Sequence, residues 1–578
     1  MAINQSDPNY TLLTKMQKRW QVMLTERGKF DSHVSTVAQN LLPRQSRFFS
    51  SDRNRGGDRN QAIIDSAGTQ ALRVLSAGMM AGMTSPARPW FRLDVPDPDL
   101  AKNHEVKLWL DEVTKMMLRV FRKSNTYNTL HFMYRELGGF GTGCSVIQPD
   151  FDNVIHHHPM TFGEYAIALD DKGVPNTLGR EFTLDIEQAI TWFGYDAVSA
   201  SARAAYDTSN YQYQVRVLHT IEPRVERDLR KQDAKNMAWA SHYAELGRTG
   251  SDNQPSEMNG LLRGSGYKIF PAITPRWDVL FNDTYGSSPG MDALGDILQL
   301  QQEQYRKSEG IDYQARPPLQ VPVALRDNDA NFLPGGVSYY DGTSASSGIR
   351  SAFDVRLDLQ YLLQDIAEVK TRINSAFYAD MFLMLATMDK TNMTATEVAE
   401  RHEEKLLMLG PVLERLHNEM LSPLIENTFA RMVSVGIVPP PPEALHGIDL
   451  DVEFVSTLAQ AQRAVGVNAT DRLVAHIGTL ANAKPGVVDN FDADKSVAQY
   501  AEALGVSPDL IVPSEQVTLI RQQRQQQQQA AQAAEIADKT AGAMNKLGGV
   551  QTNGGRSNAG SDLLNLFTGY NSPSSTEV

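Results

Sequence analysis

Two helical segments flank a proline- and glycine-rich stretch in the middle of this 578-residue chain. Apolar residues recur at intervals of three and four over Met291–Tyr313 and again over Leu357–Leu385, which predicts a helix in each segment. The stretch between them, Ala315–Arg350, is punctuated by prolines and glycines and cannot continue either helix. Its two apolar runs, Leu319–Ala324 and Val337–Tyr340, have the character of short strands. The pattern predicts paired helices joined by an insert of short strands with exposed connections.

A longer helix is predicted after the second of these segments. The tetrapeptide Thr394-Ala395-Thr396-Glu397 has the pattern of a capping box, in which the first hydroxyl accepts from the fourth backbone N–H. Apolar residues recur at helical spacing from there to about Val435, with Pro411 and Pro423 inside the pattern. Because each internal proline removes a backbone hydrogen bond, the helix should bend one turn before it. The expected bends lie near Leu407–Gly410 and near Glu419.

The remaining sequence mixes helices with short strands. The first 140 residues are predicted to be mostly helical, as are residues 458–465, 470–480 and a segment from Pro513 to about Ala543. Between Gly143 and Val279, short apolar runs separated by turn residues predict strands instead. The expected strands are Ser145–Ile147, Glu164–Leu169, Leu178–Phe182, Gln212–His219, Tyr267–Ile273 and, further on, Asp449–Val455. We therefore expect an α+β fold that is mostly helical.

Two more helices are predicted within the strand-rich region, at Ile186–Trp192 and Ala234–Glu245. The stretch Gly247–Gly266 is polar and rich in glycine and serine, which predicts an exposed loop. From Gly548 onward the chain is rich in Gly, Asn, Ser and Thr, and we expect this tail to be disordered.

Composition limits the class of protein. Apolar residues make up 41% of the chain, enough for a real core, and the length allows roughly three to five domains. The single cysteine, Cys144, rules out an intrachain disulfide and fits a reducing compartment. The first residues lack the basic and apolar regions of a signal peptide. The longest apolar run, around Phe382–Ala386, is far shorter than the roughly 18 residues of a membrane span, so no membrane partner is expected.

The net charge of −13 argues against a protein that grips nucleic acid over its whole surface, because such binding needs lysines and arginines against phosphates. One local exception is a basic segment with two phenylalanines. Its arginines are Arg44, Arg47, Arg53, Arg55 and Arg59. Two interpretations remain open: contact with DNA or an acidic partner surface, and a solvated loop.

Two motifs resemble ligand sites but favour structural roles. Gly138–Gly143 looks like a glycine fingerprint, yet it follows a predicted helix and precedes a strand, which is the reverse of the order required for dinucleotide binding. We expect a tight connector whose glycines permit close backbone packing. The run His156-His157-His158 lies on a predicted strand, where successive side chains alternate faces and do not converge on one metal ion.

Reactive groups are also interpreted as structural. Cys144 begins an apolar strand and is expected in the core rather than as a nucleophile. Asp94, Asp97 and Asp99 alternate with prolines, which indicates an extended connector and not a two-carboxylate site. No Gly-x-x-x-x-Gly-Lys-Ser/Thr phosphate loop occurs in the sequence. We therefore predict a non-enzymatic assembly protein with no catalytic residue, metal or cofactor.

Several motifs carry a resemblance to a known family. They are Tyr285-Gly286-Ser287-Ser288-Pro289-Gly290-Met291-Asp292-Ala293-Leu294-Gly295-Asp296-Ile297, Thr394-Ala395-Thr396-Glu397-Val398, Gly410-Pro411-Val412 and Glu419-Met420-Leu421-Ser422-Pro423-Leu424. With these motifs the chain resembles the head-to-tail connector, or portal protein, of short-tailed (podovirus-type) bacteriophages. The order of elements fits from about residue 10 to residue 540. These motifs are structural and name no reaction.

The resemblance implies a subunit with wing, stem, clip and crown regions that assembles into a ring, which is expected to hold twelve copies as in that family. It implies the following division: wing 1–289, first stem helix 290–314, clip 315–350, second stem helix 351–386, tunnel loop 387–393, kinked long helix and return to the wing 394–456, crown and barrel helices 457–547, and a disordered tail 548–578.

The resemblance also implies partners and a location. Double-stranded DNA would pass through the channel, and terminase, major capsid or scaffold proteins and tail adaptor proteins would dock on the ring. The protein would be made in the bacterial host cytoplasm and reside at the portal vertex of the virion. The residues expected to line the channel are Thr387, Met388, Asp389, Lys390, Thr391 and Asn392, with a loop facing capsid or solvent as the alternative.

Two other classes stay open at this point. One is a non-ring adaptor or scaffold protein, and the other is a nucleic-acid-processing packaging enzyme. The missing phosphate loop argues against the enzyme.

Overall fold

The computed structural model describes most of the chain up to residue 455 and one long helix beyond it. The described residues are 8–45, 62–97, 100, 103–231, 233–246, 261–322, 333, 335–340, 350–351, 359–387, 409–445, 447, 450–455, 476–477, 492, 495–496, 512, 514–548, 551–552 and 557–558. The chain divides into two compact units, Met1–Ala493 and Asp494–Val578, and each is described by itself.

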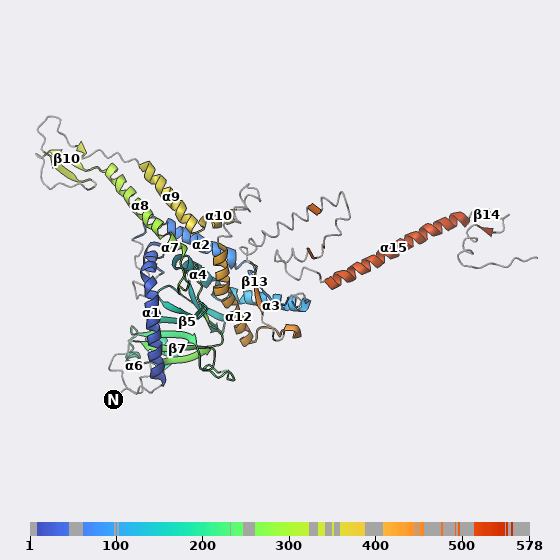
Figure 1. The fold of residues 1–578 in the computed structure, drawn as a ribbon, viewed down its shortest axis with the longest axis horizontal. Coiled ribbons are helices and arrows are strands. Elements are labelled where there is room, and N and C mark those ends of the chain that lie inside the picture. Colours follow the sequence, from blue (N-terminus) through green and yellow to red (C-terminus); the bar gives the residue numbers. More distant parts are fainter. Residues whose placement is uncertain are drawn as a thin grey trace, which may run out of the picture. The chain divides into compact units, whose positions relative to one another are not determined.

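The first unit combines helices with sheets in which most strand pairs are antiparallel (Figure 1). Its helices are α1 (Pro8–Leu41), α2 (Ala67–Met83), α3 (His104–Lys123), α4 (Thr126–Phe140), α5 (Ile186–Phe193), the 3₁₀ turn η2 (Tyr195–Ala197), α6 (Ala200–Asp207), α7 (Pro289–Asp292), α8 (Leu294–Ala315), α9 (Leu359–Ala376), α10 (Ala379–Thr387), the π-helical turn η6 (His417–Leu421), α12 (Ser422–Val435) and the 3₁₀ turn η7 (Glu443–Leu445). The predicted α+β class is confirmed.

The described residues of this unit form four sheets. Their strands are β1 (Phe91–Asp94), β2 (Cys144–Asp150), β3 (Val154–Met160), β4 (Tyr165–Leu169), β5 (Pro175–Asp185), β6 (Gln214–Pro223), β7 (Trp239–Leu246), β8 (Leu261–Tyr267), β9 (Ala272–Ile273), β10 (Leu319–Pro322), β11 (Val337–Tyr340), β12 (Arg350–Ser351) and β13 (Asp451–Phe454). The largest is the five-stranded antiparallel sheet β4-β5-β6-β7-β8, and the others are β3-β2-β9, β1-β13 and β11-β10-β12. In the last of these, β10 is parallel to β11 and antiparallel to β12.

One continuous core joins distant parts of this unit. The largest cluster of buried apolar side chains runs from Val34 in α1 to Leu445 in η7. Helix α3 shows how sequence builds it: Asn103 caps the helix by accepting from the Glu105 N–H at 3.0 Å, and the buried apolar residues follow at helical spacing. Although the length allows three to five domains, most of the buried side chains belong to this one core.

Two smaller clusters cover opposite faces of the five-stranded sheet. On β6, Val217 packs in the cluster under α5 and α6, whereas its neighbour Leu218 packs against α1. Successive side chains on a strand point to opposite faces, so α1 covers one face and α5 with α6 covers the other. This layered arrangement positions the groove described below.

The glycine-rich turn Gly138–Gly143 is a close-packing connector, as predicted. Gly141 ends α4 with φ +75°, and a Cβ there would lie 2.2 Å from the Gly286 carbonyl oxygen. A Cβ on Gly138 would lie 2.6 Å from Leu72 of α2. The Ser288 hydroxyl caps α7 and also donates to the Gly139 carbonyl at 2.9 Å. These contacts join α4 to the segment that starts the paired helices.

The predicted helix at Leu357–Leu385 is two helices. It breaks between α9 and α10 at Tyr378, whose φ is +54°. The break allows α10 to pack on α2, where Phe382 occupies the space that a Cβ on Gly78 would need. Packing against another helix therefore overrides the local helical pattern.

Two predictions in the strand-rich region are wrong. Ala234–Glu245 is not a helix, because Trp239–Leu246 forms β7 between β6 and β8. Pairing on both sides overrides the helix-favouring alanines and glutamate of this segment. The predicted loop Gly247–Gly266 ends earlier than expected, since Leu261–Tyr267 forms β8. Residues 247–260 lie outside the described part of the chain.

The helix is irregular near Glu419, where the sequence predicted a bend. Residues 417–421 form a π-helical turn immediately before Pro423, within a helix that is described from residue 409 to residue 435. A π turn shifts the hydrogen-bond register and accommodates the proline that cannot donate. The capping box at Thr394–Glu397 lies outside the described residues.

The second unit contains the helix α15 (Ser514–Gly548), where the sequence predicts one, and the short pair β14 (Gln551–Thr552) and β15 (Ser557–Asn558). The predicted helices at 458–465 and 470–480 fall almost wholly outside the described residues.

Candidate functional site

Only the start of the predicted basic segment Arg44–Arg59 is described, at Arg44 and Gln45. Arg44 is exposed in the turn after α1, whereas Arg47, Arg53, Arg55 and Arg59 lie outside the described residues. At the start of the segment, the Thr161 hydroxyl hydrogen-bonds the Gln45 carbonyl. The segment thus begins beside the loop that joins β3 to β4.

The described chain resumes after this segment, and Ile64 and Asp65 attach it to the first of the paired helices. The Gln301 side chain on α8 accepts from the backbone N–H groups of Ile64 at 2.7 Å and Asp65 at 2.8 Å. Its amide nitrogen donates to the Asp65 carbonyl at 2.9 Å. Gln301 therefore binds one backbone turn with both ends of its side chain, a role that the apolar pattern of α8 did not predict.

Asp65 also joins α8 to α9. Its carboxylate pairs with the Lys370 ammonium of α9 at 2.7 Å and accepts from Gln304 of α8 at 2.7 Å. Partial burial raises the pKa of Asp65, but the hydrogen bonds from Lys370 and from the Ala67 N–H outweigh it and lower the pKa overall. The carboxylate is thus held in its charged form between the two helices.

Glu136 is a fully buried carboxyl group on α4 that sequence analysis did not single out. Its Oε1 lies 2.8 Å from the Thr161 hydroxyl and its Oε2 accepts from the Phe162 N–H at 3.0 Å. Burial raises the pKa of Glu136 to about 8 despite these hydrogen bonds. The Thr161 hydroxyl has one proton and contacts both Glu136 and Gln45, so a protonated Glu136 satisfies both contacts.

The histidine run and the cysteine take the structural positions expected of them. His157 is buried while His156 is exposed, so neighbouring side chains do lie on opposite faces of β3. The His157 Nε2 lies 3.0 Å from the Thr126 hydroxyl, and burial lowers the pKa of His157 to about 3. Cys144 is fully buried, and burial raises the pKa of its thiol.

A buried histidine lies next to a serine in the five-stranded sheet, but the geometry does not make it a base. Arg180 Nε donates to His219 Nδ1 at 2.9 Å, and His219 Nε2 lies 2.9 Å from the Ser241 hydroxyl. Because the guanidinium can only donate, the neutral imidazole carries its proton on Nε2 and donates to Ser241. Burial lowers the pKa of His219, with a further contribution from Arg180. This set of residues therefore acts as an internal link between β5, β6 and β7.

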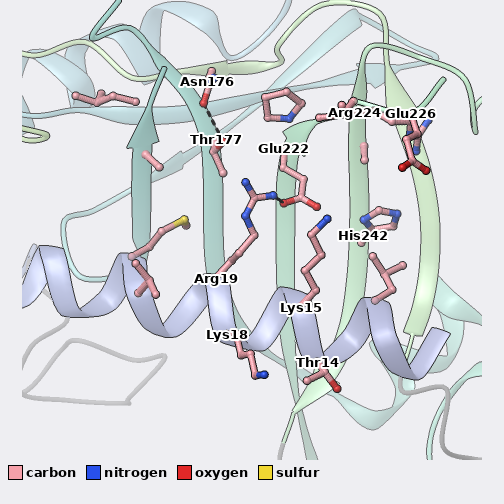
Figure 2. A pocket seen from close by; sticks show the side chains of 18 of the residues that line it. Thr14, Lys15, Lys18, Arg19, Asn176, Thr177, Glu222, Arg224, Glu226 and His242 are labelled. Atoms are coloured by element: carbon pink, nitrogen blue, oxygen red, sulfur yellow. Dashed lines mark hydrogen bonds and ion pairs between the residues drawn. The ribbon is translucent and has the colours of Figure 1, made fainter. Parts of the chain in front are cut away.

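A broad groove lies between α1 and the five-stranded sheet (Figure 2). It lies near the end of the sheet where the middle strand, β6, finishes at Glu222 and Pro223. Its volume is about 1400 Å³, and α1 crosses the strands beneath it. Arg19 of α1 pairs with Glu222 of β6 across the groove. The other charged lining residues are Lys15, Lys18, Arg224, Glu226 and Lys235. After the Arg19–Glu222 pair is set aside, cations exceed carboxylates, which is unusual on a chain of net charge −13.

Across the described residues, no three His, Cys, Asp or Glu side chains gather closely enough to hold a metal ion. In the same part of the chain, no helix has the length and apolar character that crossing a membrane requires.

Comparison with known proteins identifies the family. Residues 13–512 match the family described as bacteriophage head to tail connecting protein. The chain belongs to this family. It is 53% identical over 552 residues to a "Probable portal protein" of Bordetella phage BPP-1, which covers 96% of this chain and 98% of that protein. It is 42% identical over 511 residues to a "Portal protein" of Salmonella phage epsilon15, which covers 88% of this chain and 90% of that protein.

Among solved structures, a chain from the virion of a native gene transfer agent particle aligns with this connecting protein. The TM-score is 0.33 and the identity 11%, over 77% of this chain and 89% of that one.

In this connecting protein, the predicted channel residues are mostly outside the described part. Thr387 ends α10, and Met388, Asp389, Lys390, Thr391 and Asn392 are not described. The predicted connector with Asp94, Asp97 and Asp99 is described in part: Asp94 ends β1, opposite Asp451 of β13, and Asp99 is outside.

Proposed function

We propose that this chain is a portal subunit, which forms a ring at one vertex of a bacteriophage capsid. Double-stranded DNA passes through the ring during packaging and ejection. The observation that carries the proposal is the near full-length match to the family and to two proteins named as portal proteins. In this proposal the chain does no chemistry itself, which agrees with the orientation of the Ser241–His219 pair.

The paired helices support the proposed stem. Helices α8 and α9 lie beside each other, and Arg372 of α9 pairs with Asp296 of α8 at 3.0 Å (Figure 1). They continue into the small sheet β11-β10-β12. Several large apolar residues on the two helices remain exposed in the single chain: Leu298, Tyr305, Ile311, Tyr361 and Leu363. In a ring, neighbouring copies would cover such side chains.

The proposed portal subunit has the following regions. They are a wing (1–289), a first stem helix (290–314), a clip (315–350), a second stem helix (351–386), a tunnel loop (387–393), a kinked long helix that returns to the wing (394–456), crown and barrel helices (457–547) and a tail (548–578). We propose that the clip docks terminase during packaging and tail adaptor proteins afterwards, while the wing meets capsid or scaffold proteins.

The ring would hold twelve copies at the portal vertex of the virion. The loop Thr387–Asn392 would line the narrowest part of the channel, where Lys390 supplies the basic side chain. The arginines between Arg44 and Arg59 would contact DNA or an acidic partner surface.

Electron microscopy of the purified protein tests the proposal. The expected result is closed rings with a central channel, accompanied by light scattering of a large oligomer at micromolar concentration. A stable monomer under these conditions would contradict the portal function. Open filaments or defined small oligomers would favour an adaptor or scaffold protein.

A second experiment tests the clip. Deleting residues 341–347 should leave the rings intact and abolish terminase or tail attachment. If the deletion prevents rings from forming, this segment is an assembly element and the docking role is wrong.

A further inference from the structure

The groove of Figure 2 has an excess of positive charge that the chain itself does not neutralise. The side chains of Lys18 and Lys235 are exposed and have no hydrogen-bond or ion-pair partner among the described residues. Arg224 donates to the carbonyls of Ala234 at 2.9 Å and Met237 at 3.3 Å, which hold its guanidinium in place, and the nearby Asp233 carboxylate balances only part of the positive charge in the groove. The groove thus presents one arginine held by backbone carbonyls, together with exposed lysines in its lining.

The opposite face of the same sheet carries the complementary charge. There α5, η2 and α6 present the exposed carboxylates of Glu187, Asp196 and Asp207. Asp207 accepts from the Tyr195 hydroxyl at 2.8 Å, and the carboxylates of Glu187 and Asp196 have no partner among the described residues. We refer to the exposed side chains of α5, η2 and α6 as the acidic face.

Exposed aromatic side chains lie on the same elements as these carboxylates or directly after α6. They are Trp192, Tyr195, Tyr206 and Tyr211, between 40% and 60% exposed. The rings of Tyr195 and Tyr206 are 6.3 Å apart, so η2 and α6 form one continuous patch. Tyrosine and tryptophan gather in this way at protein–protein contacts, because each offers a large rigid surface with a polar end.

We propose that the cationic groove of one copy of this chain binds the acidic face of the next copy, and so forms the wing contact of the ring. The two surfaces lie on opposite faces of one sheet, so a copy that offers its groove to one neighbour offers its acidic face to the other. A contact between two different patches on identical chains is the head-to-tail kind that closes into rings. This inference rests on the proposed portal function and names the residues that carry the contact.

A second copy fits the groove better than DNA does. Glu226 lies among the cations of the groove, and a phosphate backbone, which carries a charge at every nucleotide, fits such a mixed lining less well than separately placed carboxylates do. A protein face with separate carboxylates and tyrosine hydroxyls can pair with the cations and also hydrogen-bond the polar groups, such as Asn176 and Thr177.

Charge reversal on the full-length chain tests the proposal. The first variant, K18E/K235E, reverses the groove, and the second, E187K/D196K, reverses the acidic face. All four positions are exposed, so circular dichroism should match that of the unmodified protein. The control K107E/K268E changes the net charge as much as the first variant, at exposed lysines outside both surfaces.

Rings of each reversed variant should dissociate at a protein concentration at least about tenfold higher than the concentration at which unmodified rings dissociate, because like charges then face each other. The control should assemble normally. The two reversed variants are then co-expressed with tags of different mass. Two copies of the same variant bring like charges together, whereas a copy of one variant attracts a copy of the other at both of its contacts. Native mass spectrometry should then show rings with equal numbers of the two variants.

The outcomes separate the inference from the function it rests on. If unmodified chains form no rings, the portal function and this contact both fail. If unmodified chains form rings and the reversed variants assemble equally well, only this contact is wrong. It is also wrong if K18E/K235E keeps its rings and loses binding to a double-stranded DNA probe, since the groove is then a DNA site.

Discussion

Arg276 holds Glu419 within the π-helical turn by three hydrogen bonds. The Arg276 backbone N–H donates to Glu419 Oε2 at 3.0 Å, Nε donates to the same oxygen at 3.1 Å, and Nη2 donates to Oε1 at 2.6 Å. Arg276 also donates to the carbonyl of Gly173 at 2.8 Å. The two side chains are only 5% and 14% exposed. This pair ties the distorted helix to the segment that follows β9.

Removing one member of this pair should destabilise the protein strongly. We expect Arg276→Ala or Glu419→Ala to lower the free energy of unfolding by about 3–5 kcal/mol, because the remaining charge stays buried without its partner. The double variant should lose less than the sum of the two single losses. Thermal unfolding of all three proteins measures this coupling. Additive losses would mean that the two side chains act independently.

Gly141 and Gly173 provide a matched test of close backbone packing. Both have positive φ, +75° and +77°, but only Gly141 has a neighbour in the position of a Cβ. Gly173→Ala should lower the free energy of unfolding by roughly 1–2 kcal/mol, because alanine is strained in the left-handed conformation. Gly141→Ala should cost clearly more, since its Cβ would lie 2.2 Å from the Gly286 carbonyl oxygen. Equal shifts in unfolding temperature would show that the contact with Gly286 does not matter.

Glu136 should make the protein less stable as the pH rises. Its pKa is about 8 in the folded chain and near 4.3 when unfolded, so the folded state binds the extra proton between these values. The contribution of Glu136 to the free energy of unfolding is complete below about pH 4.3. It is lost as the pH rises through 8, by up to roughly 1.4 kcal/mol per pH unit. Urea unfolding from pH 5 to pH 8.5 measures this slope.

Glu136→Gln should reduce that slope, because glutamine keeps an amide near Thr161 and Phe162 and does not titrate. Burial lowers the pKa of His157, so the contribution of His157 to the free energy of unfolding changes with pH in the opposite sense. It is lost as the pH falls below about 6.5. An unchanged slope in the Glu136→Gln protein above pH 6.5 would assign the pH dependence to other groups.

Lys390→Glu tests the proposed channel loop. An ammonium group on a flexible stem can contact a phosphate and release it, and at physiological salt its reach is about 8 Å. We expect rings to form normally while packaging slows or packaged DNA slips back. Lys107→Glu on α3 is the control for the change in charge. Normal packaging and retention by a Lys390→Glu ring would remove this residue from the mechanism.

Local patterns in the sequence predicted the elements that depend on few neighbours. The repeat of apolar residues located α3 and α8, and Pro423 predicted the distortion that occurs at His417–Leu421. The order of helix, glycine turn and strand around Gly141 excluded a dinucleotide site and predicted a connector, which the approach to Gly286 confirms. The family resemblance was also stated from motifs alone and is confirmed by the comparisons.

Long-range pairing decided what these patterns could not. Trp239–Leu246 is a strand because β6 and β8 bind both of its edges, and Tyr378 breaks a helix so that Phe382 can reach α2. The contacts of Arg276 with Glu419 and of Gln301 with Asp65 join residues 143 and 236 positions apart. The sequence by itself determined periodicity, turns, charge and family, which are local or compositional properties. Only the tertiary structure decided which faces of the sheet carry opposite charge and which polar groups are buried, because both depend on how distant segments pack.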